Sequence, residues 1–219
     1  MLTLIATPIG RNDEITLRSL ELLKAADVVV CESTKETSKL LKSYEIKAKR
    51  YEILDEHSTP EDVKELLALC RDQNVVLVSD CGTPSFCDPG FQLVAACRKE
   101  GLKVESSLGA SSLMGLLSLS SERIYQFHFR GFIPAETVAR EREWQSLKKT
   151  KEPIVLMDTP YRLKKMLDEC CQHLDDRKIL LALNLSQPEE CILEGRPTAV
   201  RSQLKADKAE FMILVYAKT

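Results

Sequence analysis

A glycine- and proline-rich segment directly after an aliphatic run holds the first residues that could do chemistry. Residues 75–78 read V-V-L-V, S-D-C-G-T-P follows at 79–84, and Asp88 and Gly90 complete the segment. Glycine lets a ligand approach the backbone, and proline stiffens the rim of a loop. At about eleven residues the segment exceeds the 2–6 residues typical of a strand-to-helix connection, which favours a binding loop over a plain link.

Two further loops stand in the same relation to an apolar run. Glu32 follows the run at 28–31, and T-P-I-G at 7–10 follows the run at 2–6. The runs are continuous, not alternating, and helical patterns separate them, which predicts a parallel sheet covered by helices on both faces. Ligands bind beyond the carboxyl ends of such strands. The loops at 7–10, 31–34 and 79–90 are therefore expected to share one site.

The second half of the chain has more strands per helix. Strands are expected at 125–130, 154–157, 179–183, 190–193 and 211–217, and helices at 136–149 and 161–171. This pattern predicts a mixed sheet. The predicted fold class is α/β, with an N-terminal α/β domain at 1–109 holding the loops above and a C-terminal α/β domain at 110–219.

The charge balance excludes one way of binding nucleic acid. With 31 Lys and Arg against 33 Asp and Glu, the formal net charge is −2. Proteins that hold nucleic acid by bulk charge are usually basic. If this chain binds RNA, a local patch has to do it.

The cysteines and the N-terminus indicate a cytoplasmic protein without a metal centre. The eight cysteines include no C-x-x-C pair, and no leader-like or membrane-length apolar run is visible, so reduced thiols are expected. Cys170, Cys171 and His173 lie close in sequence, but no second cluster stands at zinc spacing. Two helix thiols and a surface histidine are the expected interpretation, and no metal site is predicted.

The order of the motifs resembles one family. A-T-P-I-G at 6–10, D-E-I-T-L-R at 13–18, E-S-T-K at 32–35, S-D-C-G-T-P at 79–84 and D-P-G at 88–90 together resemble the tetrapyrrole (corrin/porphyrin) methylase superfamily. Neither a G-x-G-x-x-G fingerprint nor a P-loop is present. G-F-I-P at 131–134, Arg140 and D-T-P-Y-R at 158–162 match the branch that 2′-O-methylates a cytidine of small-subunit ribosomal RNA.

The resemblance, which spans residues 2 to about 193, implies a methyltransferase that uses S-adenosylmethionine. It also implies two α/β domains with the cofactor in the cleft between them, usually in a homodimer. The family's cofactor contacts carry over onto this chain as a set of loop and strand-end residues. These are Pro8, Asp80, Gly82, Thr83, Pro84, Ser111, Ser112 and Met157.

Methyl transfer to a hydroxyl needs alignment and a place for the proton. Alignment of donor and acceptor can supply about 7–11 kcal/mol, and a carboxylate or histidine can take the proton. Glu32 is the best-placed acid, although a carboxylate that favours the start of a helix would have the same position. His57, in D-E-H-S at 55–58, lies near a position where the family commonly has a histidine, and its alternative is a surface loop residue. Asp80 and Asp88 have turn capping as their alternative role.

Several departures from the family pattern leave the acceptor open. E-S-T-K at 32–35 stands where the family has Glu-Asp-Thr-Arg, L-G-A-S at 108–111 replaces Pro-Gly-Pro-Ser, and L-N-L-S-Q at 183–187 replaces the branch's Arg-Glu-Leu-Thr-Lys. The last change removes two cations. The leading expectation is ribosomal RNA, with a tetrapyrrole or other small molecule as one alternative and a non-catalytic cofactor-binding relative as another.

A basic cluster between residues 123 and 151 is the visible candidate for an RNA patch. It contains Arg123, Arg130, Arg140, Arg142, Lys148, Lys149 and Lys151. Glutamates at 136, 141 and 143 alternate with these cations, which favours a solvated helix face. Phe127 and Phe129 are expected in the core.

Overall fold

The computed structural model describes residues 1–218 and divides into two compact units, Met1–Ser111 (unit 1) and Ser112–Thr219 (unit 2). Each unit holds one five-stranded sheet with helices packed on it. The α/β fold with one parallel and one mixed sheet, expected from the sequence, is confirmed. The division lies two residues after the boundary drawn between 109 and 110.

Unit 1 alternates strands and helices along the chain. Its elements are β1 (Leu2–Ile5), α1 (Leu17–Ala25), β2 (Val28–Cys31), α2 (Thr34–Ser43), β3 (Tyr51–Ile53), α3 (Pro60–Asp72), β4 (Val75–Val78), α4 (Phe91–Lys99) and β5 (Val104–Ser107). The strands lie in the order β3-β2-β4-β1-β5 and all pair in parallel. The short edge strand β3 was not expected from the sequence.

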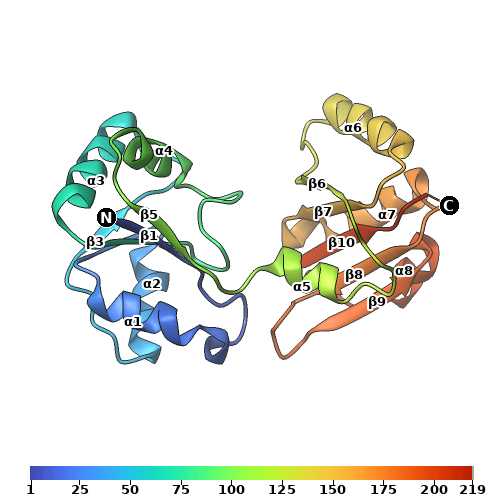
Figure 1. Cartoon of the computed structure of the whole chain (residues 1–219). Helices are drawn as coiled ribbons and strands as arrows, with labels where there is room; N and C mark the ends of the chain where they lie inside the picture. The colour runs from blue at the N-terminus through green and yellow to red at the C-terminus, as the bar shows by residue number, and fades with distance from the viewer. Residues whose placement is uncertain (219) are drawn as a thin grey trace. The chain divides into compact units, whose positions relative to one another are not determined.

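Both faces of this sheet are buried, as the continuous apolar strands require. Alternate strand residues such as Val28, Val30 and Leu77 pack with α3 and α4, and the others, such as Val29 and Val76, pack with α1 and α2. Figure 1 shows these helix pairs on opposite sides of the unit 1 strands.

Local capping fixes where the helices of unit 1 begin. The Ser33 hydroxyl accepts a hydrogen bond from the Glu36 backbone N–H at 3.3 Å, which places the cap of α2 two residues after the last residue of β2. The start of α3 has a full capping box, in which Thr59 and Asp62 each accept from the other's backbone N–H. Such caps contribute about 1 kcal/mol each. The cap at Ser33 leaves Glu32 as the only residue between β2 and the α2 cap.

Unit 2 is built on a mixed sheet. Its elements are α5 (Ser112–Ser118), β6 (His128–Gly131), α6 (Thr137–Lys149), β7 (Ile154–Asp158), α7 (Leu163–His173), β8 (Ile179–Leu183), β9 (Cys191–Gly195), α8 (Pro197–Gln203) and β10 (Phe211–Val215). In the order β6-β7-β10-β8-β9, only β6 and β7 are parallel.

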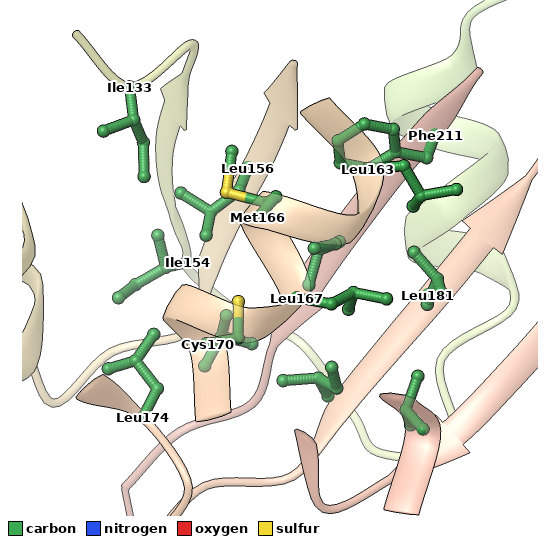
Figure 2. Close-up of a cluster of buried hydrophobic side chains, with 14 of the residues drawn as sticks. Ile133, Ile154, Leu156, Leu163, Met166, Leu167, Cys170, Leu174, Leu181 and Phe211 are labelled. Atoms are coloured by element: carbon green, nitrogen blue, oxygen red, sulfur yellow. The ribbon is translucent and has the colours of Figure 1, made fainter. Parts of the chain in front are cut away.

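Two cores flank the unit 2 sheet. On one face, α6, α7 and α8 cover a large cluster that includes Leu156, Met166 and Leu181, drawn in Figure 2. On the other face, α5 places Leu116 on Val155 and Leu214. The helices α5 and α8, each seven residues long, were not expected from the sequence.

The aromatic segment before β6 differs from its prediction. A strand was expected from residue 125, but β6 begins at His128, whose backbone N–H donates to the Pro153 carbonyl at 2.8 Å as pairing with β7 starts. Tyr125 is 83% exposed and Phe127 37% exposed, so the placement of Phe127 in the core was wrong. Phe129 is half-buried against the α5 side of the sheet.

None of the helices between residues 1 and 218 combines the length and the apolar character needed to cross a bilayer.

Candidate active site

The loops expected to share a site meet at the carboxyl edge of the unit 1 sheet. Because all five strands are parallel, the loop at 6–10, Glu32, Asp55, the loop at 79–90 and the segment at 108–111 follow strand ends on the same edge. The connections after β1 and β4 leave toward opposite faces, since α1 and α4 pack on opposite sides. Neighbouring strands that diverge in this way form the ligand crevice of open α/β sheets.

A backbone bridge fastens the loops after β1 and β4. The Thr7 N–H donates to the Gly82 carbonyl at 2.9 Å, and the Gly82 N–H donates to the Thr7 carbonyl at 3.0 Å. The buried Thr7 hydroxyl donates to the Ser79 carbonyl at 3.1 Å. The Ser79 hydroxyl in turn lies 3.2 Å from the carbonyls of Cys81 and Gly82. These hydrogen bonds hold the loops after β1 and β4 together.

Two glycines let backbones approach closely at this edge. Gly82 has φ +78°, a conformation that other residues rarely adopt. A Cβ added at Gly109 would lie 2.9 Å from the Ala6 Cβ, so the segment after β5 passes directly against the end of β1. The Thr83 hydroxyl donates to the Ala110 carbonyl at 3.1 Å and ties that segment to the loop after β4.

The loop at 79–90 also stores backbone strain. Ser85 and Cys87 have φ of +69° and +65°, the left-handed region that costs a non-glycine residue about 1 kcal/mol or more. Strain of this kind persists only where the surroundings enforce it, and it is concentrated at functional sites. Gly90, with φ +134°, ends the loop where a Cβ would lie 2.7 Å from Leu77 Cδ2.

Three carboxyl groups at this edge have pKa values above their ordinary range. Burial raises the pKa of Glu32 to about 7, and the charges of Asp88 and Asp80 add to the effect. A hydrogen bond from the Asp80 backbone to the Glu32 carboxylate opposes it. The pKa values of Asp80 and Asp88 are raised as well, first by desolvation and then by Glu36 and Asp80 respectively. Glu32 therefore exchanges a proton near neutral pH, which suits an acid–base group.

The structure places most of the sequence-predicted residues of unit 1 together. Those that lie at the carboxyl edge of its sheet are Pro8, Glu32, Asp80, Gly82, Thr83, Pro84 and Ser111. Pro8, Gly82 and Pro84 are buried, so a ligand would meet the last two through loop backbone.

His57 is not brought into the carboxylate group. Its side chain is 83% exposed, and its Nε2 lies 3.7 Å from Glu56 Oε1. Its backbone N–H donates to Asp55 Oδ1 at 2.9 Å, which holds the turn after β3.

The remaining two predicted cofactor residues belong to unit 2. Ser112 begins α5, and Met157 lies in β7, opposite Met212 of β10. Met157 is half-buried and packs in the cluster that α5 covers. Within unit 2 the two residues therefore belong to the same side of the sheet.

A buried ionic network in unit 2 was missed by sequence reasoning. Arg140, 3% exposed, donates from Nε and Nη2 to the two carboxylate oxygens of Glu169 at 2.7 and 2.6 Å. Its Nη1 donates to the carbonyls of Ile133 and Pro134 at 3.3 and 3.0 Å and lies 3.6 Å from Asp158 Oδ2. The expectation of a solvated face was wrong for Arg140, because its partners come from β7 and α7.

This network joins the two motifs that follow β6 and β7. Asp158 Oδ1 accepts from the Thr159 N–H at 2.8 Å and from Arg162 Nη1 at 3.3 Å, while Asp158 Oδ2 has no hydrogen-bond partner within residues 1–218. The G-F-I-P and D-T-P-Y-R motifs thus share the buried Arg140–Asp158 contact. Nowhere in those residues do three or more His, Cys, Asp or Glu side chains form a group that could hold a metal ion.

Comparisons with known proteins agree with this architecture. Residues 1–199 match the family model described as Tetrapyrrole (Corrin/Porphyrin) Methylases. The chain is 33% identical to the ribosomal RNA small subunit methyltransferase I of Neisseria meningitidis serogroup B, over 98% of this chain and 75% of that protein. It is 32% identical to the protein of that name from Thermotoga maritima, over 94% of this chain and 93% of the relative.

Solved structures show the same fold at lower identity. A diphthine synthase has a TM-score of 0.71 at 18% identity, with 100% of this chain and 90% of that chain covered. A uroporphyrin-III C-methyltransferase from Thermus thermophilus, complexed with S-adenosylhomocysteine, has a TM-score of 0.64 at 18% identity, with 97% and 96% covered.

Proposed function

The chain belongs to the tetrapyrrole (corrin/porphyrin) methylase family, and from that premise we propose that it transfers a methyl group from S-adenosylmethionine to a ribose 2′-hydroxyl of small-subunit ribosomal RNA. Membership makes the chain a methyltransferase and confirms the resemblance inferred from the ordered motifs. The RNA acceptor is supported by the names of relatives, ribosomal RNA small subunit methyltransferases I, that are 30–35% identical over nearly the whole chain.

The residues at the carboxyl edge of unit 1 fit the proposed methyl donor. When bound, S-adenosylmethionine supplies a methyl group on a cationic sulfonium, which leaves as a neutral thioether. Glu32, Asp80 and Asp88 place negative charge where a sulfonium and an ammonium group would be stabilised. Gly82 and Gly109 let the loops after β4 and β5 pack against Ile9 and Ala6, which fixes the edge that a nucleoside would meet. Within unit 2, Ser112 and Met157 stay predicted contacts.

Glu32 is the residue that we propose for the proton of the acceptor hydroxyl. A carboxylate with a pKa of about 7 is ionised often enough at neutral pH to accept a proton, and it is more basic than an ordinary carboxylate. As the new O–CH₃ bond forms and the S–CH₃ bond breaks, the hydroxyl proton passes to the Glu32 carboxylate. Asp80 and Asp88 keep that carboxylate basic by their charge. His57, exposed beyond β3, remains a proposed contact to the acceptor.

The observation that carries the proposal is the position of Glu32, at the end of β2, on the edge that the braced Thr7–Gly82 loops also occupy. The test incubates the full chain with small-subunit ribosomal RNA and methyl-labelled S-adenosylmethionine. Ribose methylation is mapped by resistance of the modified linkage to alkali. We expect label in one alkali-resistant linkage with the wild type, and none with Glu32→Gln.

Matched controls separate the parts of the proposal. Glu65→Gln removes an exposed carboxylate of α3 in the same unit and should leave activity unchanged. Calorimetry with S-adenosylhomocysteine tests the cofactor alone, and absence of binding at high micromolar concentration would contradict it. If label is transferred to a uroporphyrinogen and not to RNA, the proposed acceptor is wrong and the methyltransferase activity stands.

The resemblance also supports a homodimer in the cytoplasm. Light scattering on the purified chain should give about twice the 24.7 kDa of one copy. A mass of one copy across micromolar concentrations would exclude a stable dimer.

A further inference from the structure

Helix α2 presents three lysines on one face. Lys35, Lys39 and Lys42 stand at positions i, i+4 and i+7, which at 3.6 residues per turn places them within an arc of about 60°. The opposite face carries Thr37 and Leu41, both buried against the sheet. The lysines, all exposed, therefore form a continuous stripe that points away from unit 1.

The stripe continues beyond the helix. Lys47 is exposed. A hollow of about 430 Å³ lies at the C-terminal end of α2, and its lining includes two cations and one acid: Ser38, Lys42, Glu45, Ile46, Lys47, Ala48 and Tyr51. Lys35, Lys39, Lys42 and Lys47, which we call the α2 lysine stripe, enter no ion pair with any residue from 1 to 218. The two neighbouring cations do, since Lys49 pairs with Asp27 at 2.8 Å and Arg50 pairs with Glu52.

Helix stability does not account for this arrangement. Lys35 lies in the first turn of α2, where the helix dipole disfavours a cation. Lys35 and Lys39 are an i,i+4 pair of like charges, and Lys39 and Lys42 are an i,i+3 pair. Each such pair costs about 0.2–0.5 kcal/mol. Glu36, the acid of the same helix, forms no ion pair with these lysines. A helix that tolerates these costs indicates an external partner of negative charge.

Because the net charge is −2, RNA binding would require a local basic patch, and the region around α2 provides one. Residues 33–51 contain six cations and two anions. The other candidate is the basic cluster at 123–151, and several of its arginines already contact residues of unit 2. Arg130 pairs with Glu143, Arg140 with Glu169, and Arg123 donates to the Tyr125 hydroxyl.

We propose that the α2 lysine stripe is the track along which the sugar–phosphate backbone of a single-stranded RNA segment binds, with one nucleotide seated in the hollow at its end. The proposal rests on the RNA acceptor argued above and assigns the surface that holds it. Lys35 to Lys42 spans about 10 Å of helix, and each of the three ammonium groups can contact one phosphate of a flexible single strand. The stripe begins three residues after Glu32, so bound RNA is led to the strand end where its ribose would react.

The test measures how salt weakens RNA binding. The probe is a 5′-fluorescein-labelled twelve-nucleotide uridine RNA, bound by the full chain and followed by fluorescence anisotropy between 50 and 200 mM salt. Each phosphate contact contributes about −0.7 to the slope of log K against log salt for single strands. Lys35→Gln/Lys39→Gln/Lys42→Gln should reduce that slope by about 2, so wild-type affinity falls about 20-fold more than the variant's over this range.

A matched variant controls for net charge. Lys148→Gln/Lys149→Gln/Lys151→Gln removes three exposed cations of unit 2 and should leave the slope within about 0.5 of the wild type. Lys35→Arg/Lys39→Arg/Lys42→Arg keeps the three charges and should bind RNA as the wild type does. Binding of S-adenosylhomocysteine should be unchanged in all variants, and the glutamine stripe variant should be at least as stable as the wild type because repulsion is removed.

Five results would overturn the proposal. Equal slopes for the stripe variant and the wild type would refute it, as would a larger loss from the variant at 148, 149 and 151. Competition by polyglutamate as strong as that by RNA would indicate an acidic protein partner. If the stripe variant still methylates ribosomal RNA with unchanged KM, the surface is wrong and the proposed function stands. A wild type that binds S-adenosylhomocysteine but no RNA refutes both.

Discussion

Replacing Glu32 by glutamine should stabilise the protein while removing its activity. The Glu32 pKa is about 7 in the folded chain, against an ordinary 4.5, chiefly through burial and then through Asp88 and Asp80. Between these two pH values the folded state holds a proton that the unfolded state has lost. Stability therefore falls as pH rises from 4.5 to 7 and stays reduced above 7. Glutamine keeps the shape and carries no charge, so it removes this cost.

The magnitude follows from the pKa difference. A difference of this size corresponds to roughly 3.4 kcal/mol for a group shielded from water. The Glu32 side chain is only partly buried, so solvent screening reduces the expected gain to about 1–2 kcal/mol at pH 8. Below pH 4.5 both states of the wild type are protonated, and the gain should vanish.

The activity has its own pH dependence. With a pKa of about 7, about 9% of the Glu32 side chains are ionised at pH 6 and about 91% at pH 8, so kcat/KM should rise about tenfold over that range. An ordinary carboxyl would give a flat profile there. Glu32→Gln should lower the rate by about 10²- to 10⁴-fold, the usual contribution of a general base.

The assay pairs urea unfolding with initial rates at several pH values. Unfolding is followed by circular dichroism, because the one tryptophan, Trp144, lies in unit 2 and reports on that unit. Glu65→Gln should change neither quantity. A wild-type profile that is flat from pH 6 to 8 would refute the assignment of the base. A Glu32→Gln chain less stable than the wild type at pH 8 would refute the linkage argument.

Two further substitutions test the scaffold of each unit. Arg140→Ala should lower the free energy of unfolding of unit 2 by about 3–5 kcal/mol, measured by Trp144 fluorescence in urea, because the half-buried Glu169 loses its cation and the buried Asp158 keeps only Arg162. The exposed Arg142→Ala on the same helix should change it by less than about 0.5 kcal/mol, and equal effects would contradict the network. Gly109→Ala should weaken binding of S-adenosylhomocysteine in calorimetry at least tenfold, because its Cβ would lie 2.9 Å from Ala6 and displace the loop; unchanged affinity would remove this segment from the cofactor site.

Local signals predicted most of the parallel half of the fold. The strands at 28–31 and 75–78 were expected at the bounds that the structure shows, because a short aliphatic run between helical patterns has few other uses. Pro8, Glu32 and Gly82 come from separate motifs but were expected at one site. Each follows the end of a strand, and in a parallel sheet all strands end at the same edge. His57 came from a family position, and nothing local placed it.

The misses depend on contacts between segments distant in sequence. Arg140 stands among glutamates, which is the pattern of a solvated face, and its half-buried partner Glu169 is 29 residues away. The edge strand β3 is three residues long and exists because Tyr51–Ile53 pairs with β2. Helix α5 follows the serines at the domain boundary and has no clear helical pattern. It forms because Leu116 packs against residues of β8 and β10. No periodicity within a short window contains these partners.

Unit 1 carries an acidic cluster (Glu32, Asp80 and Asp88) and a basic one (the α2 lysine stripe), and the two begin close together in the sequence. This separation of charge can orient a substrate. Glu32, which belongs to the acidic cluster, directly follows β2. The α2 lysine stripe begins three residues later. Acids near the reacting hydroxyl repel phosphates and attract a sulfonium, whereas the stripe attracts phosphates. A nucleotide can satisfy both only with its phosphates along α2 and its ribose toward Glu32. The near-zero net charge is therefore no argument against an RNA acceptor, because it averages over two clusters whose separation is what specifies the orientation.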